Sequence, residues 1–334
     1  MKKYQIIWAE RDGKSREIIG NAASKAPCDV TAVARSCGYE DIYVYNPHCS
    51  NKLISVLIRL YRLKRALSCC EKDSTILIQY PCFNEAVFQF AKYFFPNRNY
   101  ITVVHDLNSI RVNGKISKAE VSALSVFKKI IVHSPEMKDC LSDSLLSGKD
   151  YYILDCFPYL TDSVCQQSKS LNEVCFAGNI DKSVFLKEFI PHVHNIKLKL
   201  YGRMENKLPL SANVEYCGMF NPNDISSLSG SWGLVWDGNS VETCSGTWGK
   251  YLKIIAPHKF SLYIAAGIPV IVWEKSAMAR LVRKYNIGIT IESLTELETK
   301  IGDVFSYDEI KENIQHYRED IINAVLLTNI MKYV

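Results

Sequence analysis

Residues 257–271 read Pro-His-Lys-Phe-Ser-Leu-Tyr-Ile-Ala-Ala-Gly-Ile-Pro-Val-Ile. The run predicts a helix that opens with a basic pair, a tight turn at Gly267-Ile268-Pro269, and then a buried strand. At a helix start, free backbone amides and the positive end of the dipole favour an anion, and Lys259 adds a full charge there. A phosphate group fits this position. The alternative is a solvated lysine on a helix whose alanines allow close packing against a sheet.

Strand-like runs alternate with helical patterns on both sides of this segment, which predicts parallel sheets in an α/β fold. The predicted strands are 4–8, 41–45, 75–80, 100–105, 129–133, 151–154, 173–177, 197–201, 214–217, 232–236 and 269–273. A polar stretch over 161–172 reads as a linker. We therefore predict two Rossmann-like domains facing a central cleft, over 1–160 and 161–311, with a C-terminal helix over 312–334 that braces the first domain.

Composition excludes several classes of protein. The 334 residues are 48% hydrophobic and 22% charged, as in a soluble globular enzyme or binding protein. A net charge of +5 is mild, and no basic and aromatic stripe indicates a nucleic-acid partner. The longest nearly uncharged run, 260–273, is shorter than the roughly 20 residues of a membrane span, and no signal-peptide pattern is found, so we expect a cytoplasmic protein. The twelve cysteines lack zinc-ligand spacing, which predicts reduced thiols and no metal site.

Two loops of the second half are candidate ligand contacts because open α/β sheets bind ligands at the carboxyl ends of their strands. Gly178 permits close approach to the backbone, Asn179 can cap a helix or contact the ligand, and Lys182 adds a charge. The alternative is a plain capped helix with an exposed lysine. Asp237 follows strand 232–236 and either accepts a sugar hydroxyl or belongs to an ordinary Asp-Gly turn.

In the first half, His105 and Asp106 end a predicted strand, where a general base would lie. Asp106 is the first choice and His105 the second, while a structural, capping aspartate carries equal weight. Asn21 and Ser24 follow the first strand among small residues, which would let an acceptor or a diphosphate approach the backbone. A merely flexible loop is the default reading for that segment.

Residues 52–65 combine an apolar face with five cations and no acid. This pattern is typical of a helix that lies on an anionic membrane surface. The alternative is that the apolar face packs into the core and the basic face is solvated.

The run from Pro257 to Ile271 resembles the nucleotide-sugar segment of two-domain GT-B glycosyltransferases. Further motifs resemble the bacterial β-1,6-galactofuranosyltransferase family and the related glucosyltransferases that extend glycans on serine-rich adhesins. These motifs are 174–183, Tyr201-Gly202, 233–238, and His105-Asp106-Leu107 with Arg111. The resemblance implies donor contacts from Lys259, His258, Lys182, Asn179, Gly178, Tyr201, Asp237 and Tyr263, and an acceptor-side role for Arg111.

Two departures from other glycosyltransferases narrow the mechanism. Common retaining GT-B enzymes carry a pair of glutamates where this chain has Ile254 and Leu262. Metal-dependent GT-A enzymes use an Asp-x-Asp motif, and this sequence contains none. We therefore expect the diphosphate to be neutralised by Lys259, Lys182 and helix amides, without a metal.

The expected function is metal-independent, inverting transfer of a hexose from a UDP-sugar, with UDP-galactofuranose as first choice, to a hydroxyl of a bacterial surface glycan. The acceptor would be a glycan or a lipid-linked saccharide, and no cofactor besides the UDP-sugar co-substrate is expected. Two alternatives stay open: a UDP-glucose-dependent glucosyltransferase acting on a glycoprotein glycan, and a noncatalytic subunit that binds a UDP-sugar or a glycan. Peripheral attachment through 52–65 to the inner face of the membrane, and a homo-oligomer, also stay open.

Overall fold

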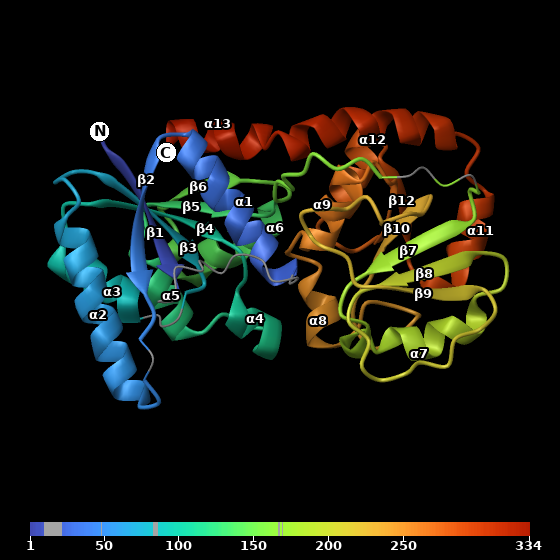
Figure 1. The fold of residues 1–334 in the computed structure, drawn as a ribbon, viewed down its shortest axis with the longest axis horizontal. Coiled ribbons are helices and arrows are strands. Elements are labelled where there is room, and N and C mark those ends of the chain that lie inside the picture. Colours follow the sequence, from blue (N-terminus) through green and yellow to red (C-terminus); the bar gives the residue numbers. More distant parts are fainter. Residues whose placement is uncertain (10–21, 48, 83–85, 166–167, 169) are drawn as a thin grey trace. The chain divides into compact units, whose positions relative to one another are not determined.

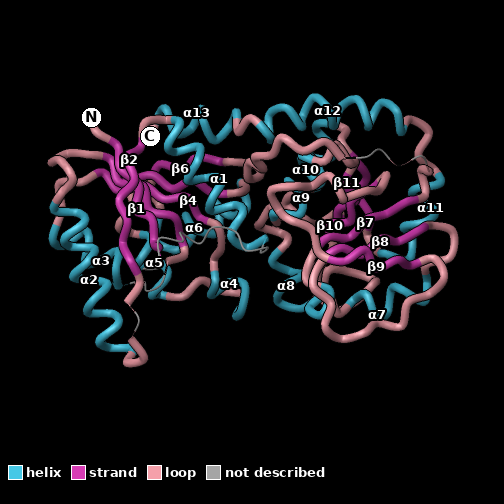
Figure 2. Tube along the Cα trace, viewed as in Figure 1, coloured by secondary structure: helices cyan, strands magenta, loops and turns pink. Residues whose placement is uncertain are grey.

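The computed structural model describes residues 1–9, 22–47, 49–82, 86–165, 168 and 170–334. The chain forms two compact units, each a parallel sheet flanked by helices (Figure 1; Figure 2). Among the described residues, the first unit consists of 1–9, the chain from Ala23 to Leu154, and Leu326–Val334, and the second consists of Ala22 and Asp155–Val325. This division gives the two-domain Rossmann-like α/β fold that the sequence predicts.

The first unit is built on a six-stranded parallel sheet in the order β2-β1-β3-β4-β5-β6. Its strands are β1 (Lys3–Ala9), β2 (Tyr39–Tyr45), β3 (Thr75–Tyr80), β4 (Asn99–Val104), β5 (Lys129–Val132) and β6 (Asp150–Ile153). Its α-helices are α1 (Ala22–Ser36), α2 (Lys52–Ser68), α3 (Ala86–Phe94), α4 (Asn108–Asn113), α5 (Lys118–Leu124), α6 (Pro135–Leu141) and α13 (Val325–Tyr333). The central strands are apolar and buried because helices cover both faces of such a sheet. The strand order reverses between β1 and β3, which is the switch point of this unit.

The second unit has its own six-stranded parallel sheet, in the order β12-β11-β10-β7-β8-β9. Its strands are β7 (Glu173–Ala177), β8 (Lys197–Tyr201), β9 (Val214–Gly218), β10 (Trp232–Val235), β11 (Val270–Trp273) and β12 (Gly288–Ile291). Its α-helices are α7 (Phe185–Phe189), α8 (Gly246–Tyr251), α9 (His258–Ala265), α10 (Ala279–Tyr285), α11 (Leu297–Gly302) and α12 (Tyr307–Ile322). This order is that of the dinucleotide-binding fold, and its switch point lies between β7 and β10.

Among the described residues, β12 is the strand that the sequence analysis did not predict. It is four residues long and begins with Gly288, a residue type that is depleted in strands. The structure explains the glycine, since a Cβ at Gly288 would lie 2.0 Å from the Val270 carbonyl oxygen of β11. The close approach of the β11 and β12 backbones thus requires a glycine at this position, and a glycine does not indicate a strand in the sequence.

The C-terminal segment forms two helices, where the sequence predicted one over 312–334. The break follows Ile322, and Ala324 has a φ of 51°. In α12, Lys311 Nζ and Arg318 Nε donate to the carbonyl oxygens of Gly267 and Ala265, each at 2.8 Å. These cations satisfy carbonyl groups at the carboxyl end of α9. In the first unit, α13 receives a hydrogen bond of 2.8 Å from Lys3 Nζ to the Met331 carbonyl.

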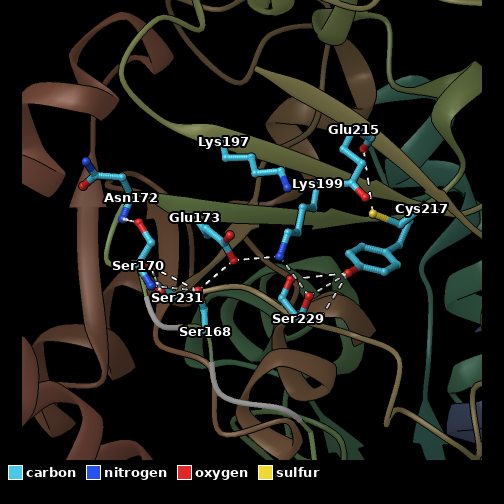
Figure 3. A network of polar contacts seen from close by, with 11 residues as sticks. Ser168, Ser170, Asn172, Glu173, Lys197, Lys199, Glu215, Cys217, Ser229 and Ser231 are labelled. Atoms are coloured by element: carbon cyan, nitrogen blue, oxygen red, sulfur yellow. Dashed lines mark hydrogen bonds and ion pairs between the residues drawn. The ribbon is translucent and has the colours of Figure 1, made fainter. Parts of the chain in front are cut away.

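A polar network ties β7 to β8 and to the segment that precedes β10 (Figure 3). Glu173 Oε2 accepts hydrogen bonds of 2.7 Å from Lys199 Nζ and from Ser168 Oγ, and Lys199 Nζ also donates to Ser229 Oγ at 3.0 Å. Burial acts to raise the pKa of Glu173, but the hydrogen bonds from Lys199 and Ser168 outweigh it and lower that pKa overall. Ser229 in turn holds the Tyr201 hydroxyl.

Candidate functional site

The second unit's site is organised by Tyr263 of α9, which is fully buried at the switch point. Its hydroxyl accepts a hydrogen bond from Ala177 N at 2.7 Å and donates one to the Leu234 carbonyl at 3.2 Å. It therefore bridges β7 and β10 beyond the last pair of residues that the two strands share, Gly233 and Cys175. A Cβ at Gly233 would lie 2.2 Å from the tyrosine ring. Tyr263 is thus a positioning residue that fixes α9 against the strand ends.

Lys259 lies at the start of the same helix, and its ammonium group points at the end of β10. Its Nζ donates to the Trp236 carbonyl at 3.0 Å and lies 4.7 Å from the centre of the Phe176 ring. Burial lowers the pKa of Lys259, and the nearby Asp237 opposes this only in part. An ammonium group has three N–H donors, and within the described residues Lys259 has one hydrogen-bond acceptor and no ion pair. An anion in contact with Nζ would complete its partners.

The backbone at the start of α9 favours the same kind of ligand. Its N-cap residue is Pro257, which makes no side-chain cap hydrogen bond to the first turn. The amides of that turn and the positive end of the dipole are therefore suited to an anion. His258 stacks on Tyr159 with ring centres 4.8 Å apart.

The loop after β10 folds back tightly on the segment before α8. Asp237 Oδ1 accepts a hydrogen bond of 2.9 Å from Gly238 N. Gly238 has a φ of 109°, and a Cβ there would lie 2.4 Å from the Ser245 carbonyl oxygen. Asp237 remains partly exposed in this turn, so its second oxygen can accept a hydroxyl hydrogen bond.

The Phe176 ring connects the loop after β7 to Lys259. A Cβ on Gly178 would lie 3.4 Å from Phe176 Cζ, so the ring that contacts Lys259 also packs beside Gly178. Gly202, which the sequence analysis quoted without assigning a role, is needed here because a Cβ there would lie 1.8 Å from the Gly178 carbonyl oxygen. Phe176 also lay within a quoted motif without being singled out as a site residue.

Of the remaining candidates of the second unit, Asn179 and Tyr201 have partners within the protein. Asn179 is exposed, and its Oδ1 accepts from Lys182 N at 3.1 Å, which caps the 3₁₀ turn Ile180–Lys182. Lys182 itself is exposed. Tyr201 is buried, and its hydroxyl contacts Ser229. Asn179 therefore makes the helix cap that the sequence analysis kept as its alternative. The Tyr201 hydroxyl is held by Ser229, which precedes β10.

In the first unit, His105 follows β4 and is held by β3. Its backbone N donates to the Tyr80 carbonyl at 2.7 Å, and its Nε2 lies 2.6 Å from Gln79 Oε1. The Gln79 amide donates to the Pro27 carbonyl and to Thr31 Oγ1, so its oxygen faces the imidazole. Because an amide oxygen can only accept, Nε2 is the donor in this contact.

Asp106 and Arg111, to which the sequence analysis gave separate roles, come together as an ion pair. Arg111 also donates to Asn108 Oδ1 at 2.7 Å, at the start of α4. Both partners are partly exposed. The ion pair fixes the orientation of the Asp106 carboxylate.

Sequence reasoning missed Glu120, which is fully buried in α5. Its carboxylate accepts hydrogen bonds from the Tyr80 hydroxyl at 2.9 Å and from the Ser109 backbone and hydroxyl groups. It thereby anchors the segment that carries Asp106 and Arg111. The sequence offers no local signal for this role, since a glutamate in a first helical turn is usually exposed.

Of the two candidates that follow the first strand, the structure describes Ser24. Asn21 lies outside the described residues. Ser24 is partly buried in the first turn of α1. Next to it, Lys25 forms a buried ion pair with Asp29, with Nζ–Oδ distances of 2.5 and 2.7 Å, which the sequence did not suggest.

Two domain models of one family cover the chain, the glucosyltransferase 3-like N-terminal domain at residues 17–156 and the corresponding C-terminal domain at 174–334. The chain belongs to the glucosyltransferase 3-like family. It is therefore a glycosyltransferase, as the sequence analysis expected. Similar proteins include the β-1,6-galactofuranosyltransferase WbbI of Escherichia coli (strain K12), 26% identical with 96% of this chain and 95% of that protein covered. Glucosyltransferase 3 of Streptococcus gordonii is 26% identical, with 87% and 86% covered.

Solved structures share the fold of this glycosyltransferase. The lipopolysaccharide outer core galactosyltransferase WaaB matches with a TM-score of 0.61 and 10% identity over 98% of each chain. OtsA matches with a TM-score of 0.55 and 9% identity over 99% of this chain and 98% of that one. Within the described residues, no group of three or more His, Cys, Asp or Glu side chains is placed to hold a metal ion.

Replacing Gly233 with alanine tests the packing of Tyr263. We expect Gly233→Ala to destabilise the protein by about 1–3 kcal/mol, because the added Cβ overlaps a ring that has no room to move. The matched control is Gly302→Ala, whose Cβ meets no atom within 4 Å and which should change stability by at most about 1 kcal/mol. Urea unfolding measures both, and equal stabilities would contradict the positioning role.

Proposed function

We propose that this glycosyltransferase transfers a hexose from a UDP-sugar to a glycan hydroxyl, with the donor diphosphate bound at the start of α9. The observation that carries the proposal is the Lys259 ammonium, which is partly buried at the start of α9 and has one carbonyl partner among the described residues. A diphosphate would supply the charge that burial of this group requires. The position beside the switch point between β7 and β10 supports the same ligand.

We propose UDP-galactofuranose as the donor. The support is the similarity to WbbI, named as a β-1,6-galactofuranosyltransferase, over nearly the full length of both chains. UDP-glucose is the second candidate, because glucosyltransferase 3 of Streptococcus gordonii is equally identical over a shorter share of the chain.

The proposed reaction is a single displacement with inversion. The acceptor oxygen forms a bond to the anomeric carbon, the bond from that carbon to the phosphate oxygen breaks, and UDP leaves with the electron pair. The acceptor proton passes to Asp106 as first choice or to His105 as second. Lys259 and the α9 amides stabilise the charge that develops on UDP. Leu262, buried where retaining relatives of this fold carry a glutamate, supports inversion.

A screen of purified enzyme against a panel of UDP-sugars tests the donor. We expect turnover of UDP-galactofuranose above UDP-glucose, an inverted product by NMR, and unchanged rates in excess chelator. Faster turnover of UDP-glucose would reassign the donor, and loss of activity with the chelator would contradict the metal-free mechanism. Binding of UDP without turnover of any sugar would support a noncatalytic subunit.

Removing the Lys259 charge tests the diphosphate site. We expect Lys259→Met to lower kcat/KM for the donor at least tenfold and to weaken UDP binding, since one preorganised charge at the leaving group is lost. The matched control is Lys284→Met, an exposed lysine whose Nζ lies 4.7 Å from the Tyr285 ring centre. Calorimetry with UDP separates a binding role from a folding role. Unchanged UDP affinity in a folded Lys259→Met protein would remove Lys259 from the site.

The general base can be assigned by two conservative variants. We expect Asp106→Asn to lower kcat by a factor of about 10² or more and to remove the acidic limb of the pH–rate profile, with UDP affinity retained. His105→Gln should have a smaller effect if Asp106 is the base. The reverse ranking would assign the role to His105, and near-wild-type rates for both variants would exclude the pair.

A further inference from the structure

One apolar stripe of α2 lies on the surface, while Leu63 and Leu67 pack into the core, as the alternative in the sequence analysis expected. Only Ser55, Leu63 and Leu67 of this helix are buried. Leu53, Leu57 and Tyr61 are 77%, 65% and 66% exposed. Their spacing of four residues places them in one stripe along the helix. The stripe is therefore a contiguous apolar surface and not a set of scattered residues.

This surface continues onto the neighbouring helix α3 (Figure 1). Lys64 Nζ of α2 lies 4.7 Å from the centre of the Phe94 ring, and Phe94 and Tyr93 are both exposed. We call this region the α2–α3 surface; it consists of Leu53, Ile54, Leu57, Tyr61, Tyr93 and Phe94.

Cations border the α2–α3 surface. The helix over Lys52–Ser68 contains five lysines and arginines and no acidic residue. Arg62 and Arg65 line a hollow of about 380 Å³ with Tyr43 and Tyr45 of β2, and none of its lining residues is acidic. Arg62 Nη1 donates to the Tyr45 carbonyl at 2.7 Å, which holds its guanidinium at the hollow. Arg62 and Arg65 are the charged residues of this lining, and guanidinium groups suit a phosphodiester. The Tyr43 hydroxyl is held by Arg35 and Asp41.

We propose that the α2–α3 surface docks on an anionic phospholipid membrane, with α2 lying in the interface and the hollow facing the headgroups. An apolar stripe bordered by cations is the pattern of an interfacial helix. None of the helices in the described residues is long and apolar enough to cross a bilayer. A second copy fits less well, because a two-fold contact through α2 would set two acid-free, five-cation helices against each other.

Vesicle cosedimentation tests the apolar part. The full-length protein should bind vesicles of phosphatidylcholine with phosphatidylglycerol much more strongly than vesicles of phosphatidylcholine alone, and less at high salt. Leu53→Ser/Leu57→Ser/Tyr61→Ser should reduce partitioning at least tenfold. Met219→Ser/Phe305→Ser, which removes exposed apolar side chains from the second unit, should bind as the wild type does.

A charge-matched pair of variants tests the electrostatic part. Lys64→Gln/Arg65→Gln should weaken binding to the anionic vesicles by a factor of about 25, at roughly fivefold for each charge. Lys207→Gln/Lys300→Gln removes the same charge from exposed sites of the second unit and should change binding less than threefold. Melting temperature and activity on a soluble acceptor establish that each variant is folded.

Several outcomes would overturn the docking proposal. One is equal binding of the wild type to neutral and anionic vesicles, and another is unchanged binding of the α2–α3 variants. A third is an oligomer that the triple variant converts to monomers, because this result would assign the surface to a second copy. The assay does not depend on the donor, so a failure of the proposed sugar transfer and a failure of membrane docking are distinguishable.

Discussion

The packing of the Tyr263 ring against the backbone of Gly233 is the constraint on which the geometry of the proposed donor site depends. The ring occupies the volume of a side chain that β10 lacks, and its hydroxyl satisfies backbone groups of both β7 and β10. In a parallel sheet, strands that part at a switch point leave unpaired amides and carbonyls, which are costly to bury. One tyrosine therefore satisfies the parted strands and sets the start of α9, with Lys259, beside them.

The first unit uses buried polar groups for the same purpose. Glu120 accepts hydrogen bonds from Ser109 and Tyr80, and Gln79 contacts the imidazole of His105. These side-chain hydrogen bonds fix the ends of β3 and β4. A buried carboxylate is tolerated only when such bonds compensate its desolvation. Rigid support of this kind keeps a reacting side chain in one orientation, which is how proteins preorganise a site.

Local sequence patterns predicted the helices and strands, whereas contacts between residues far apart in the sequence determine what each site residue does. Apolar β-branched runs such as 75–80 identified strands because both faces of a parallel sheet are buried. The sequence did not predict β12, because this short strand begins with a glycine. The motif assigned Tyr263 to donor binding, and the structure shows in addition that its hydroxyl and ring contact β7 and β10. Glu120 was missed because its partners come from other elements. For α2, periodicity identified an apolar face without revealing that Leu53, Leu57 and Tyr61 stay exposed while Leu63 and Leu67 are buried.

The electrostatics of Lys259 connect the fold to the proposed chemistry. Protein atoms alone lower its pKa, since burial removes water and Asp237 compensates only in part. A diphosphate in contact with Nζ would act in the opposite direction and favour the charged form. The interaction would then strengthen as negative charge grows on the departing UDP, because a partly dehydrated cation responds more strongly to a nearby anion than a solvated one. Such a site stabilises the transition state more than the bound donor, which is the condition for catalysis.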